Sequence, residues 1–202
     1  DAIAKGKETA SEYLDAHRAW HQLGGRSTCT MLFGHVETIE QRIDHLAQLR
    51  ALQDETGGFT GFIPLPYQPE NNAIPVTHPP TGNDALRTIA VSRLFLDNFD
   101  HLTAYWVGLG MKLAQVALSY GADDLHGTIV EENIFRMAGT GAPQSQPEAA
   151  LIKAIREAGK TPVQRNTFYE PVREWTDDTP DAPHSPDDSV PPNLLDDNLA
   201  TA

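Results

Sequence analysis

Residues 30–37 read Thr30-Met31-Leu32-Phe33-Gly34-His35-Val36-Glu37, and a helical pattern begins just after them at Ile39. A short apolar run ends here at a glycine, and a polar loop with a histidine and a glutamate follows it. This pattern is typical of a β-strand that delivers polar groups at its carboxyl end, the place where α/β barrels carry their chemistry. It predicts an α/β fold with a functional site in the loop after the strand.

The composition indicates one domain with a sizeable core. The chain has 202 residues, 40% of them hydrophobic, and a net charge of −13 from 15 basic and 28 acidic residues. Nucleic acids and anionic membranes both favour Lys and Arg on their partners, so this charge argues against either kind of partner. The single cysteine, Cys29, gives no intrachain disulfide, and neither a signal-peptide pattern nor an apolar run of membrane length is present. These features predict a cytoplasmic protein.

Helical and strand patterns alternate along the chain. Alternation at this spacing indicates a parallel α/β sheet, and about four βα units are half of a (β/α)8 barrel. We expect helices at Thr9–Leu23, from Ile39 to the Gly57-Gly58 pair, and at Asp84–Phe99, Lys112–Tyr120, Glu131–Ala138 and Pro147–Ala158. We expect strands at Ser27–Phe33, Phe59–Leu65, Leu102–Leu109 and, very short, Ala122–Leu125, with an extended return segment at Val163–Tyr169.

The C-terminal end differs in composition from the rest of the chain. Residues 176–202 are rich in Asp and Pro and contain neither Lys nor Arg. A segment with so few apolar anchors cannot offset the entropy of ordering. We therefore predict a folded region at 1–175 and a disordered acidic tail at 176–202.

Several distinctive runs lie along most of the chain, between about Thr9 and Pro171. They include Gly34-His35-Val36-Glu37-Thr38, Gln53-Asp54-Glu55-Thr56-Gly57-Gly58-Phe59, Arg87-Thr88-Ile89-Ala90-Val91-Ser92-Arg93, Ala104-Tyr105-Trp106 and Gly121-Ala122-Asp123-Asp124-Leu125-His126-Gly127-Thr128. Together these runs resemble the radical S-adenosylmethionine enzymes of the futalosine route to menaquinone. Within that family, Tyr105-Trp106, Pro69-Glu70-Asn71 and His126-Gly127-Thr128 resemble the aminofutalosine synthase branch more than the dehypoxanthine futalosine cyclases.

The resemblance implies a (β/α)8 barrel that holds a 4Fe–4S cluster and S-adenosylmethionine. It also implies a reaction in which a 5′-deoxyadenosyl radical adds to the enol-ether double bond of 3-[(1-carboxyvinyl)oxy]benzoate, and rearrangement with loss of carbon dioxide gives aminofutalosine. The family's CxxxCxxC loop has no match here, because Cys29 is the single cysteine and a cluster needs cysteine ligands. The chain thus resembles the C-terminal half of the barrel. We expect it to be inactive alone and to need the missing N-terminal half as its partner.

The run Thr30-x-Leu32-x-Gly34-x-x-Glu37 resembles the GxIxGxxE pattern of radical S-adenosylmethionine enzymes, with Thr in place of the first Gly. In that family this strand lies against the adenine, so the resemblance implies that Thr30, Leu32, Gly34 and Glu37 bind the cofactor. The simpler alternative is a strand end with a glycine turn, and a Glu37 that faces the positive end of a helix dipole. His35 is a candidate for catalytic proton transfer, because its pKa is near ambient pH, or else a hydrogen-bonded loop residue.

Other candidates come at the ends of later strands. Gln68, Glu70 and Asn71 follow the second strand, where barrels bind their substrates, although turn formation explains them equally. Asp123 and Asp124 come at the last short strand. Adjacent carboxylates there can bind ribose hydroxyls or accept protons, so we expect Asp123 to contact substrate and Asp124 to be catalytic, unless one of them caps a turn.

Helical positions supply weaker candidates. Arg87 offers a guanidinium fork to a dicarboxylate substrate, although a solvent-facing ion pair is the simpler role. His17 and His21 are four residues apart and could hold a metal, but no third ligand is visible, so we expect no metal site. Tyr105 and Trp106 alternate sides of their expected strand, and core packing is the better explanation for both.

Two other functions fit the same residues. The sister cyclase has the same fold and cluster but abstracts hydrogen, and product analysis separates it from the synthase. A half-barrel that binds a ligand or partner without catalysis is the second alternative. The lone Cys29 favours it for the chain taken by itself, because one thiolate cannot hold a cluster.

Overall fold

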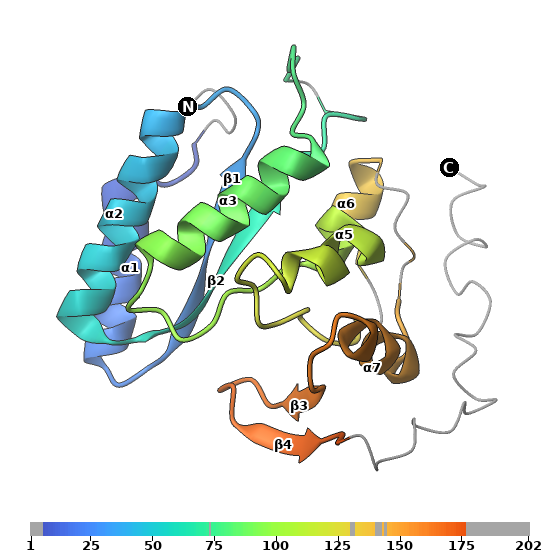
Figure 1. The fold of residues 1–202 in the computed structure, drawn as a ribbon. Coiled ribbons are helices and arrows are strands. Elements are labelled where there is room, and N and C mark those ends of the chain that lie inside the picture. The colour runs from blue at the N-terminus through green and yellow to red at the C-terminus, as the bar shows by residue number, and fades with distance from the viewer. Residues whose placement is uncertain (1–5, 73, 130–131, 140–142, 144, 177–202) are drawn as a thin grey trace, which may run out of the picture.

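The computed structural model describes residues 6–72, 74–129, 132–139, 143 and 145–176 (Figure 1). Helices and strands alternate through the first half, and a hairpin follows the last helix. The helices are α1 (Ala10–Gln22), α2 (Ile39–Thr56), α3 (Gly82–Phe95), α4 (Trp106–Leu109), α5 (Met111–Ala117), α6 (Ile134–Met137) and α7 (Glu148–Glu157). The strands are β1 (Ser27–Phe33), β2 (Phe59–Pro66), β3 (Val163–Arg165) and β4 (Pro171–Glu174).

The first two expected strands are confirmed and pair in parallel. The register places Cys29 opposite Phe62 and Phe33 opposite Pro66. Along β1 the odd positions are buried and the even ones are open, so that Thr30 and Leu32 are exposed. This alternation is that of a strand whose one face packs against helices. β2 is buried almost throughout, as a central strand of a parallel sheet should be.

Side-chain caps define where the helices of the βα units begin. The Thr38 hydroxyl accepts a hydrogen bond from the Gln41 backbone N–H, and the Gln41 side chain accepts one from the Thr38 N–H, so the two residues form a capping box. α2 ends at Gly57, whose left-handed φ of 60° suits a helix C-terminus. These local signals explain why the boundaries of α2 could be predicted from the sequence.

Beyond β2 the sheet continues through isolated parallel bridges. The Phe62 amide donates to the His101 carbonyl over 3.0 Å, and the Thr103 amide donates to the Phe62 carbonyl over 2.9 Å. Thr103 in turn bridges Asp124, because the Ala104 amide donates to the Asp124 carbonyl over 2.8 Å. The backbone thus runs in parallel from β1 through β2 and Thr103 to Asp124, although only β1 and β2 form regular strands.

The expected strand Leu102–Leu109 is wrong beyond its first residues. Its second half is helix α4, in which the Trp106 indole is fully buried and its Nε1 donates to the Gly127 carbonyl over 2.9 Å. Burial of this ring turns the chain where the β-forming residues predict a strand, since tertiary packing overrides β propensity. The expected strand Ala122–Leu125 is likewise reduced to the bridge at Asp124, because residues with positive φ, Gly121 and His126, flank it.

Other boundaries also differ from the expected ones. α3 ends at Phe95 rather than Phe99, since Phe99 turns inward and stacks on Phe59 at 5.4 Å between ring centroids. α6 starts at Ile134 rather than Glu131, because the Glu132 carboxylate accepts from the Ile134 and Phe135 amides as a cap in front of the helix. Only Val163–Arg165 of the expected segment Val163–Tyr169 is a strand, and it pairs in antiparallel fashion with β4.

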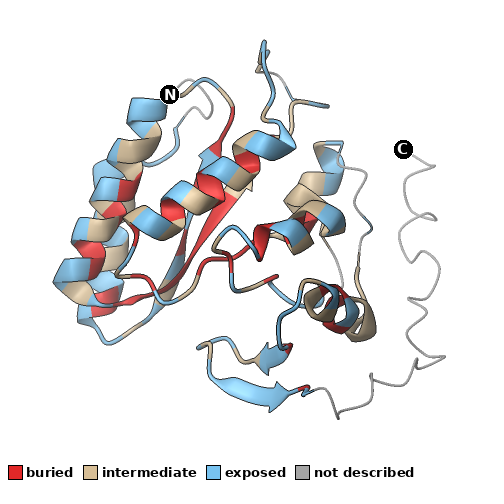
Figure 2. Ribbon diagram, in the orientation of Figure 1, coloured by how far each residue is buried: buried red, intermediate tan, exposed pale blue. Residues whose placement is uncertain are grey.

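The core lies between the sheet and the helices that cover one face of it. Its largest fully buried side chains include Phe33, Phe59, Phe62, Leu46 and Trp106. In Figure 2 the buried residues follow β1, β2 and the inward sides of the helices, whereas the β3–β4 hairpin is mostly exposed. The architecture is mixed α/β and consistent with part of a barrel. The predicted tail falls almost wholly outside the described residues.

Candidate functional site

The loop after β1 is organised by the Glu37 carboxylate. Its Oε1 accepts from the Gly34 amide over 2.5 Å and from Arg42 Nε over 2.7 Å, and its Oε2 accepts from the His35 amide over 2.9 Å. Partial burial by itself would raise the pKa of Glu37, but the two backbone donors outweigh it and lower that pKa. Glu37 is therefore an ionised anchor that fixes the shape of this loop.

Gly34 is required by its backbone and by a neighbouring loop. Its φ is +85°, and a Cβ atom built on it would lie 2.6 Å from the Pro80 ring. Thr30 and Leu32, the other two residues of the expected cofactor pattern, have exposed side chains on β1. A cavity of about 510 Å³ borders this strand and is lined by Thr30, Leu32, His35 and Glu37 together with residues of α1 and α2. The structure thus brings most of the expected cofactor residues to one cavity.

His35 lies at the rim formed by the carboxyl ends of β1 and β2. Its Nε2 is 3.2 Å from the Leu32 carbonyl, and its Nδ1 accepts from the Val36 amide over 2.7 Å. Nδ1 also lies 2.9 Å from Glu37 Oε2, so the ring is tied to the same carboxylate that organises the loop. The ring meets Tyr67, just past β2, edge-on at 6.1 Å between centroids.

The loop after β2 is held against α4 and α6. Gln68 Nε2 donates to the Gly108 carbonyl over 3.1 Å, and Asn71 Nδ2 donates to the Met137 carbonyl over 3.3 Å. Asn71 has a φ of +56°, which suits a turn residue. Glu70 packs so close to Gly139 that a Cβ built there would lie 2.5 Å from it. Each of the three expected substrate residues therefore has a structural contact in this loop.

An aromatic cluster at the same rim was not among the predicted site residues. The ring centroid of Tyr105 lies 5.2 Å from that of His126 and 5.5 Å from that of Phe135. Burial raises the pKa of Tyr105 to about 12 and lowers the pKa of His126. A sequence signal was present, because Tyr105 and His126 each come two residues after a residue that bridges in the sheet, Thr103 and Asp124. The sequence analysis gave Tyr105 a packing role and His126 none.

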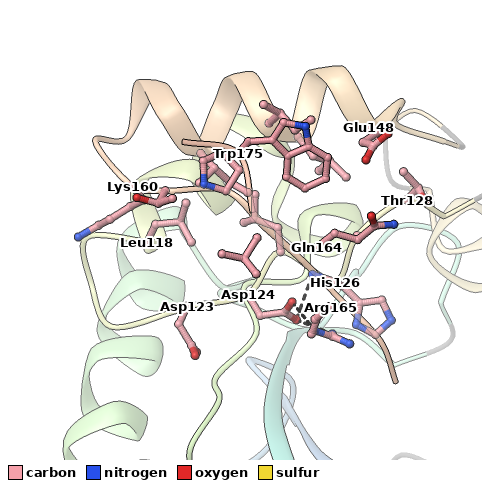
Figure 3. Close-up of a pocket in the computed structure, with 18 of the residues that line it drawn as sticks. Leu118, Asp123, Asp124, His126, Thr128, Glu148, Lys160, Gln164, Arg165 and Trp175 are labelled. Carbon is pink, nitrogen blue, oxygen red and sulfur yellow. Dashed lines mark hydrogen bonds and ion pairs between the residues drawn. The ribbon is translucent and has the colours of Figure 1, made fainter. Parts of the chain in front are cut away.

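The adjacent carboxylates Asp123 and Asp124 bind different partners, and Asp124 faces Arg165 (Figure 3). Asp123 Oδ1 accepts from Arg93 Nη2 over 2.8 Å and from the Leu102 amide over 2.7 Å, while its Oδ2 lies 2.7 Å from His101 Nδ1. These contacts tie the helix α3 to the sheet. They leave Asp123 engaged within the protein rather than free for a substrate.

Asp124 is engaged by a different set of groups. Arg165 binds it in a bidentate manner, Nε to Oδ1 over 2.9 Å and Nη2 to Oδ2 over 3.0 Å. Its Oδ2 also accepts from Thr103 Oγ1 over 2.7 Å and from the His126 amide over 3.1 Å. Burial would raise the pKa of Asp124, but the Arg165 guanidinium and the Thr103 hydroxyl lower it. The carboxylate is thus held ionised, which disfavours proton uptake near neutral pH.

Arg87, the remaining candidate, is exposed on α3. It borders neither the cavity beside β1 nor the larger cavity described next. Its charge is one of the smaller causes that lower the pKa of Asp84 on the same helix, after the hydrogen bonds from Thr81. The structure does not bring Arg87 to the other candidate residues.

A cavity of about 730 Å³ lies beside residues 122–128 (Figure 3). Apolar side chains of α7, including Leu151 and Ile152, form one wall, and the β3 segment with Trp175 forms another. Asp124, His126 and Arg165 border its polar part. The two cavities therefore flank the first and the last parallel segments of the sheet.

Metal and cluster ligands are scarce in the described part of the chain. Residues 6–72, 74–129, 132–139, 143 and 145–176 contain no group of three or more His, Cys, Asp or Glu that could hold a metal ion. Cys29 is 1% exposed within β1, and burial raises the pKa of its thiol well above the usual value. A buried neutral thiol does not fit a 4Fe–4S cluster, which requires thiolates. No described helix is long and apolar enough to cross a membrane.

Comparison with known proteins gives this geometry a context. Residues 56–179 match the family described as the CofH/MqnC C-terminal region. The chain belongs to this family. The matched segment begins at the end of α2 and includes β2, the loop after it, both carboxylates and the β3–β4 hairpin. The predicted membership in the radical S-adenosylmethionine family of the futalosine pathway is thereby confirmed.

Relatives with several activities resemble the chain. An aminodeoxyfutalosine synthase of Thermus thermophilus is 47% identical over 177 residues, 86% of this chain and 48% of that protein. A cyclic dehypoxanthine futalosine synthase of Streptomyces coelicolor is 44% identical over 84% of this chain and 42% of its own length. A 5-amino-6-(D-ribitylamino)uracil–L-tyrosine 4-hydroxyphenyl transferase of Methanosarcina barkeri is 40% identical over 88% of this chain and 49% of its own length. The chain spans about half the length of these relatives.

Proposed function

We propose that this chain is the C-terminal half of a radical S-adenosylmethionine barrel that makes aminofutalosine from 3-[(1-carboxyvinyl)oxy]benzoate. The observation that carries this proposal is the 47% identity to the Thermus thermophilus synthase over 86% of the chain. The sister cyclase follows at 44%, so the choice between the two reactions depends on the products formed. Both reactions use the same half of the barrel.

The pairing of the sheet supports the half-barrel. Within the described residues, β1 pairs with β2 on one side only, and Asp124 bridges Thr103 on one side only. A closed barrel has no free edges. We propose that an N-terminal half of the kind found in the longer relatives pairs with both ends, next to the two cavities. A 4Fe–4S cluster would belong to that half, because Cys29 does not fit it.

The cavity beside β1 is the proposed position of S-adenosylmethionine. Thr30 and Leu32 offer exposed side chains there, and Glu37 holds the Gly34 turn open through its two backbone hydrogen bonds. When bound, S-adenosylmethionine would supply the adenosyl group that the reaction transfers. His35 lies at the same rim, and we propose that its imidazole exchanges a proton there, with Glu37 Oε2 2.9 Å from Nδ1.

The substrate would lie over the rim between the loops after β2 and after Asp124. Gln68, Glu70 and Asn71 belong to the loop after β2. His126 belongs to the loop after Asp124, and Tyr105 packs against it. We propose that Asp123 and Asp124 serve this site indirectly, because their oxygens are occupied by Arg93, Arg165 and backbone amides. Arg87 has no role in the proposed site, since it is exposed on α3.

The test is reconstitution with a complementary half. The chain is co-expressed with the N-terminal half of the Thermus thermophilus relative, the complex is purified and loaded with cluster anaerobically, and products are identified by mass spectrometry. We expect aminofutalosine from S-adenosylmethionine and 3-[(1-carboxyvinyl)oxy]benzoate. A cyclised product from dehypoxanthine futalosine would assign the chain to the sister reaction. A cluster-loaded complex that forms neither product would favour the non-catalytic half-barrel.

Matched variants test the residues in the same assay. Gln68→Leu removes the hydrogen bond to the Gly108 carbonyl at the rim and should lower kcat/KM at least about tenfold, the effect of losing roughly 1.4 kcal/mol of positioning. Arg87→Gln changes an exposed residue of α3 and should leave kcat/KM within about twofold. Equal losses in both variants would contradict the proposed position of the substrate.

A further inference from the structure

We propose that Arg165 is a positioning residue, which acts through Asp124 to fix the backbone and the ring of His126 at the rim. The inference rests on the proposed function only in treating His126 and Tyr105 as part of the site. The geometry itself involves residues of this chain alone and can be measured on it. The path runs from the β3–β4 hairpin, through one carboxylate, to the loop that follows the last parallel segment.

The first step is the ion pair between Arg165 and Asp124. It is bidentate, at 2.9 and 3.0 Å, and the exposed fractions of the two side chains are 24% and 11%. Parallel N–H···O bonds of this kind fix orientation as well as distance, which a single lysine ammonium cannot do. The guanidinium therefore determines which way the Asp124 oxygens point.

The second step is the hydrogen bond from the His126 amide to Asp124 Oδ2, over 3.1 Å. His126 has a φ of +73°, a left-handed conformation that is unfavourable for a residue with a Cβ unless other contacts stabilise it. Thr103 Oγ1 donates to the same oxygen over 2.7 Å and holds it from the sheet side. The carboxylate thus stabilises the unusual backbone of His126 from a fixed position.

The third step places the ring. From this backbone the His126 imidazole meets Tyr105 edge-on, at 5.2 Å and an interplanar angle of 82°. Phe135 packs against Tyr105 at 5.5 Å between centroids, and Glu132 lies near enough to raise the pKa of the Tyr105 phenol further. A change in the φ of His126 would remove its ring from this cluster.

Arg165 is itself held from the hairpin side. Its guanidinium carbon lies 3.8 Å from the centroid of the Tyr169 ring, which stacks on His101 at 4.2 Å with an interplanar angle of 9°. Gly61 of β2 leaves room for this tyrosine, because a Cβ there would lie 2.7 Å from the Tyr169 hydroxyl. A cation over an aromatic face is attracted to the negative face of the ring. The hairpin therefore presents Arg165 to Asp124 in one orientation.

The charges of this path act on His126 with opposite signs. Burial lowers the pKa of His126, the Asp124 carboxylate raises it, and the Arg165 guanidinium lowers it. Removal of one partner or the other should therefore shift the pKa in opposite directions. A merely structural role would not give shifts in opposite directions, because loss of the local fold would return the pKa of His126 to about 6.5 in either variant.

The experiment is an NMR titration of the histidine side chains in the full chain, with His126 assigned by a His126→Gln variant. Arg165→Gln should raise the pKa of His126 by about half a unit or more, and Asp124→Asn should lower it by a similar amount. Arg173→Gln is the matched control, since Arg173 lies in the same hairpin and packs on Trp175 instead. It should leave the pKa of His126 unchanged.

Two outcomes would overturn the proposal. One is a pKa of His126 that does not change in Arg165→Gln. The other is the same pKa of His126 in Arg165→Gln and in Asp124→Asn. If Arg165→Gln does not fold, Arg165→Lys replaces it. A lowered pKa of His126 in Asp124→Asn, together with a smaller change of that pKa in Arg165→Lys, then supports the proposal. Failure of the reconstituted complex to form product would count against the proposed function but would not alter this result.

Discussion

Gly34 and Pro80 lie so close together that a Cβ atom on Gly34 would stand 2.6 Å from the proline ring. The family pattern implies that this glycine is needed because the cofactor comes close to the backbone. The structure gives a second reason within the protein, because the loop before α3 closes over the same turn. The backbone also has a φ of +85°, which residues with a side chain adopt at a cost.

Replacement of Gly34 by alanine should destabilise the chain by about 2–5 kcal/mol, the sum of a left-handed backbone and an overpacked contact. Urea unfolding measures this change. Gly57→Ala is the control, because Gly57 has a φ of +60° but nothing within 4 Å of the added Cβ, so only about 1–2 kcal/mol should be lost. In a Pro80→Gly background the cost of Gly34→Ala should fall to that of the control. An unchanged cost there would mean that Pro80 is not the reason for the glycine.

The Glu37 carboxylate should stabilise the protein in a pH-dependent way. Its pKa is lowered in the folded state, so its contribution is present above the pKa of the unfolded chain and is lost as the pH falls through the folded value. Glu37→Gln should lower the free energy of unfolding at pH 7 by about 1–3 kcal/mol, the range for hydrogen bonds to a charged group. The difference from the unsubstituted chain should shrink below about pH 4.

Glu40 supplies the comparison for this experiment. It lies in the first turn of the same helix and is exposed, so Glu40→Gln alters the same helix end without removing the loop anchor. Its effect at pH 7 should be much smaller. Equal effects in the two variants would show that the helix dipole, rather than the hydrogen bonds to the Gly34 and His35 amides, explains the stabilisation by Glu37.

The sequence predicted the first half of the fold because its signals are local. β1 alternates buried and exposed residues, β2 is a short apolar run between Gly58 and a proline-rich loop, and the capping box fixes the start of α2. The prediction of a strand through Trp106 was wrong. The β-forming residues of this segment do not reveal that the indole donates a hydrogen bond to the Gly127 carbonyl. Tertiary contacts of this kind decide the structure of short segments.

The site was predictable to the same extent. Gly34 and Glu37 were named from a spacing pattern, and the hydrogen bond that joins them lies within that pattern. The contact of Gly34 with Pro80 lies outside it and was not predicted. Asp124 was singled out as a catalytic candidate, but its partner Arg165 is 41 residues away in a segment expected only to be extended. A spacing pattern contains no information about which distant cation occupies a carboxylate, so the indirect role proposed for Asp124 became visible only in three dimensions.

Two histidines of α1, which contact Ser27 at the start of β1, should make the chain sensitive to mild acid. His17 Nδ1 and His21 Nε2 each lie 2.8 Å from the Ser27 hydroxyl, and burial lowers the pKa of both rings. A histidine with a lowered pKa destabilises the fold as the pH falls below its unfolded value of about 6.5, because the unfolded chain then binds more protons. The free energy of unfolding should therefore fall between pH 7.5 and pH 5.5.

The size of this fall can be assigned by substitution. His17→Gln removes one titrating ring while its amide still reaches Ser27, and it should reduce the pH dependence measured by urea unfolding. His78→Gln, at an exposed position, should leave the dependence as it was. The contributions of His45 and His126, whose pKa values are also lowered, remain in both variants. An identical pH dependence in His17→Gln would show that the pair does not titrate as a buried unit.

The Cys29 thiol should be unreactive in the folded chain. Its thiol is buried, its pKa is raised well above the usual value, and its Sγ lies 3.9 Å from the Gly61 carbonyl. Thiolate is the reactive and metal-binding form, so a disulfide reagent should react only as fast as the chain opens, and urea should accelerate the reaction. Anaerobic incubation of the chain alone with iron and sulfide should likewise give no stoichiometric cluster, and Cys29→Ala should behave identically. Stable incorporation of about four irons per chain, lost in Cys29→Ala, would contradict both the burial of the thiol and the assignment of the cluster to the other half.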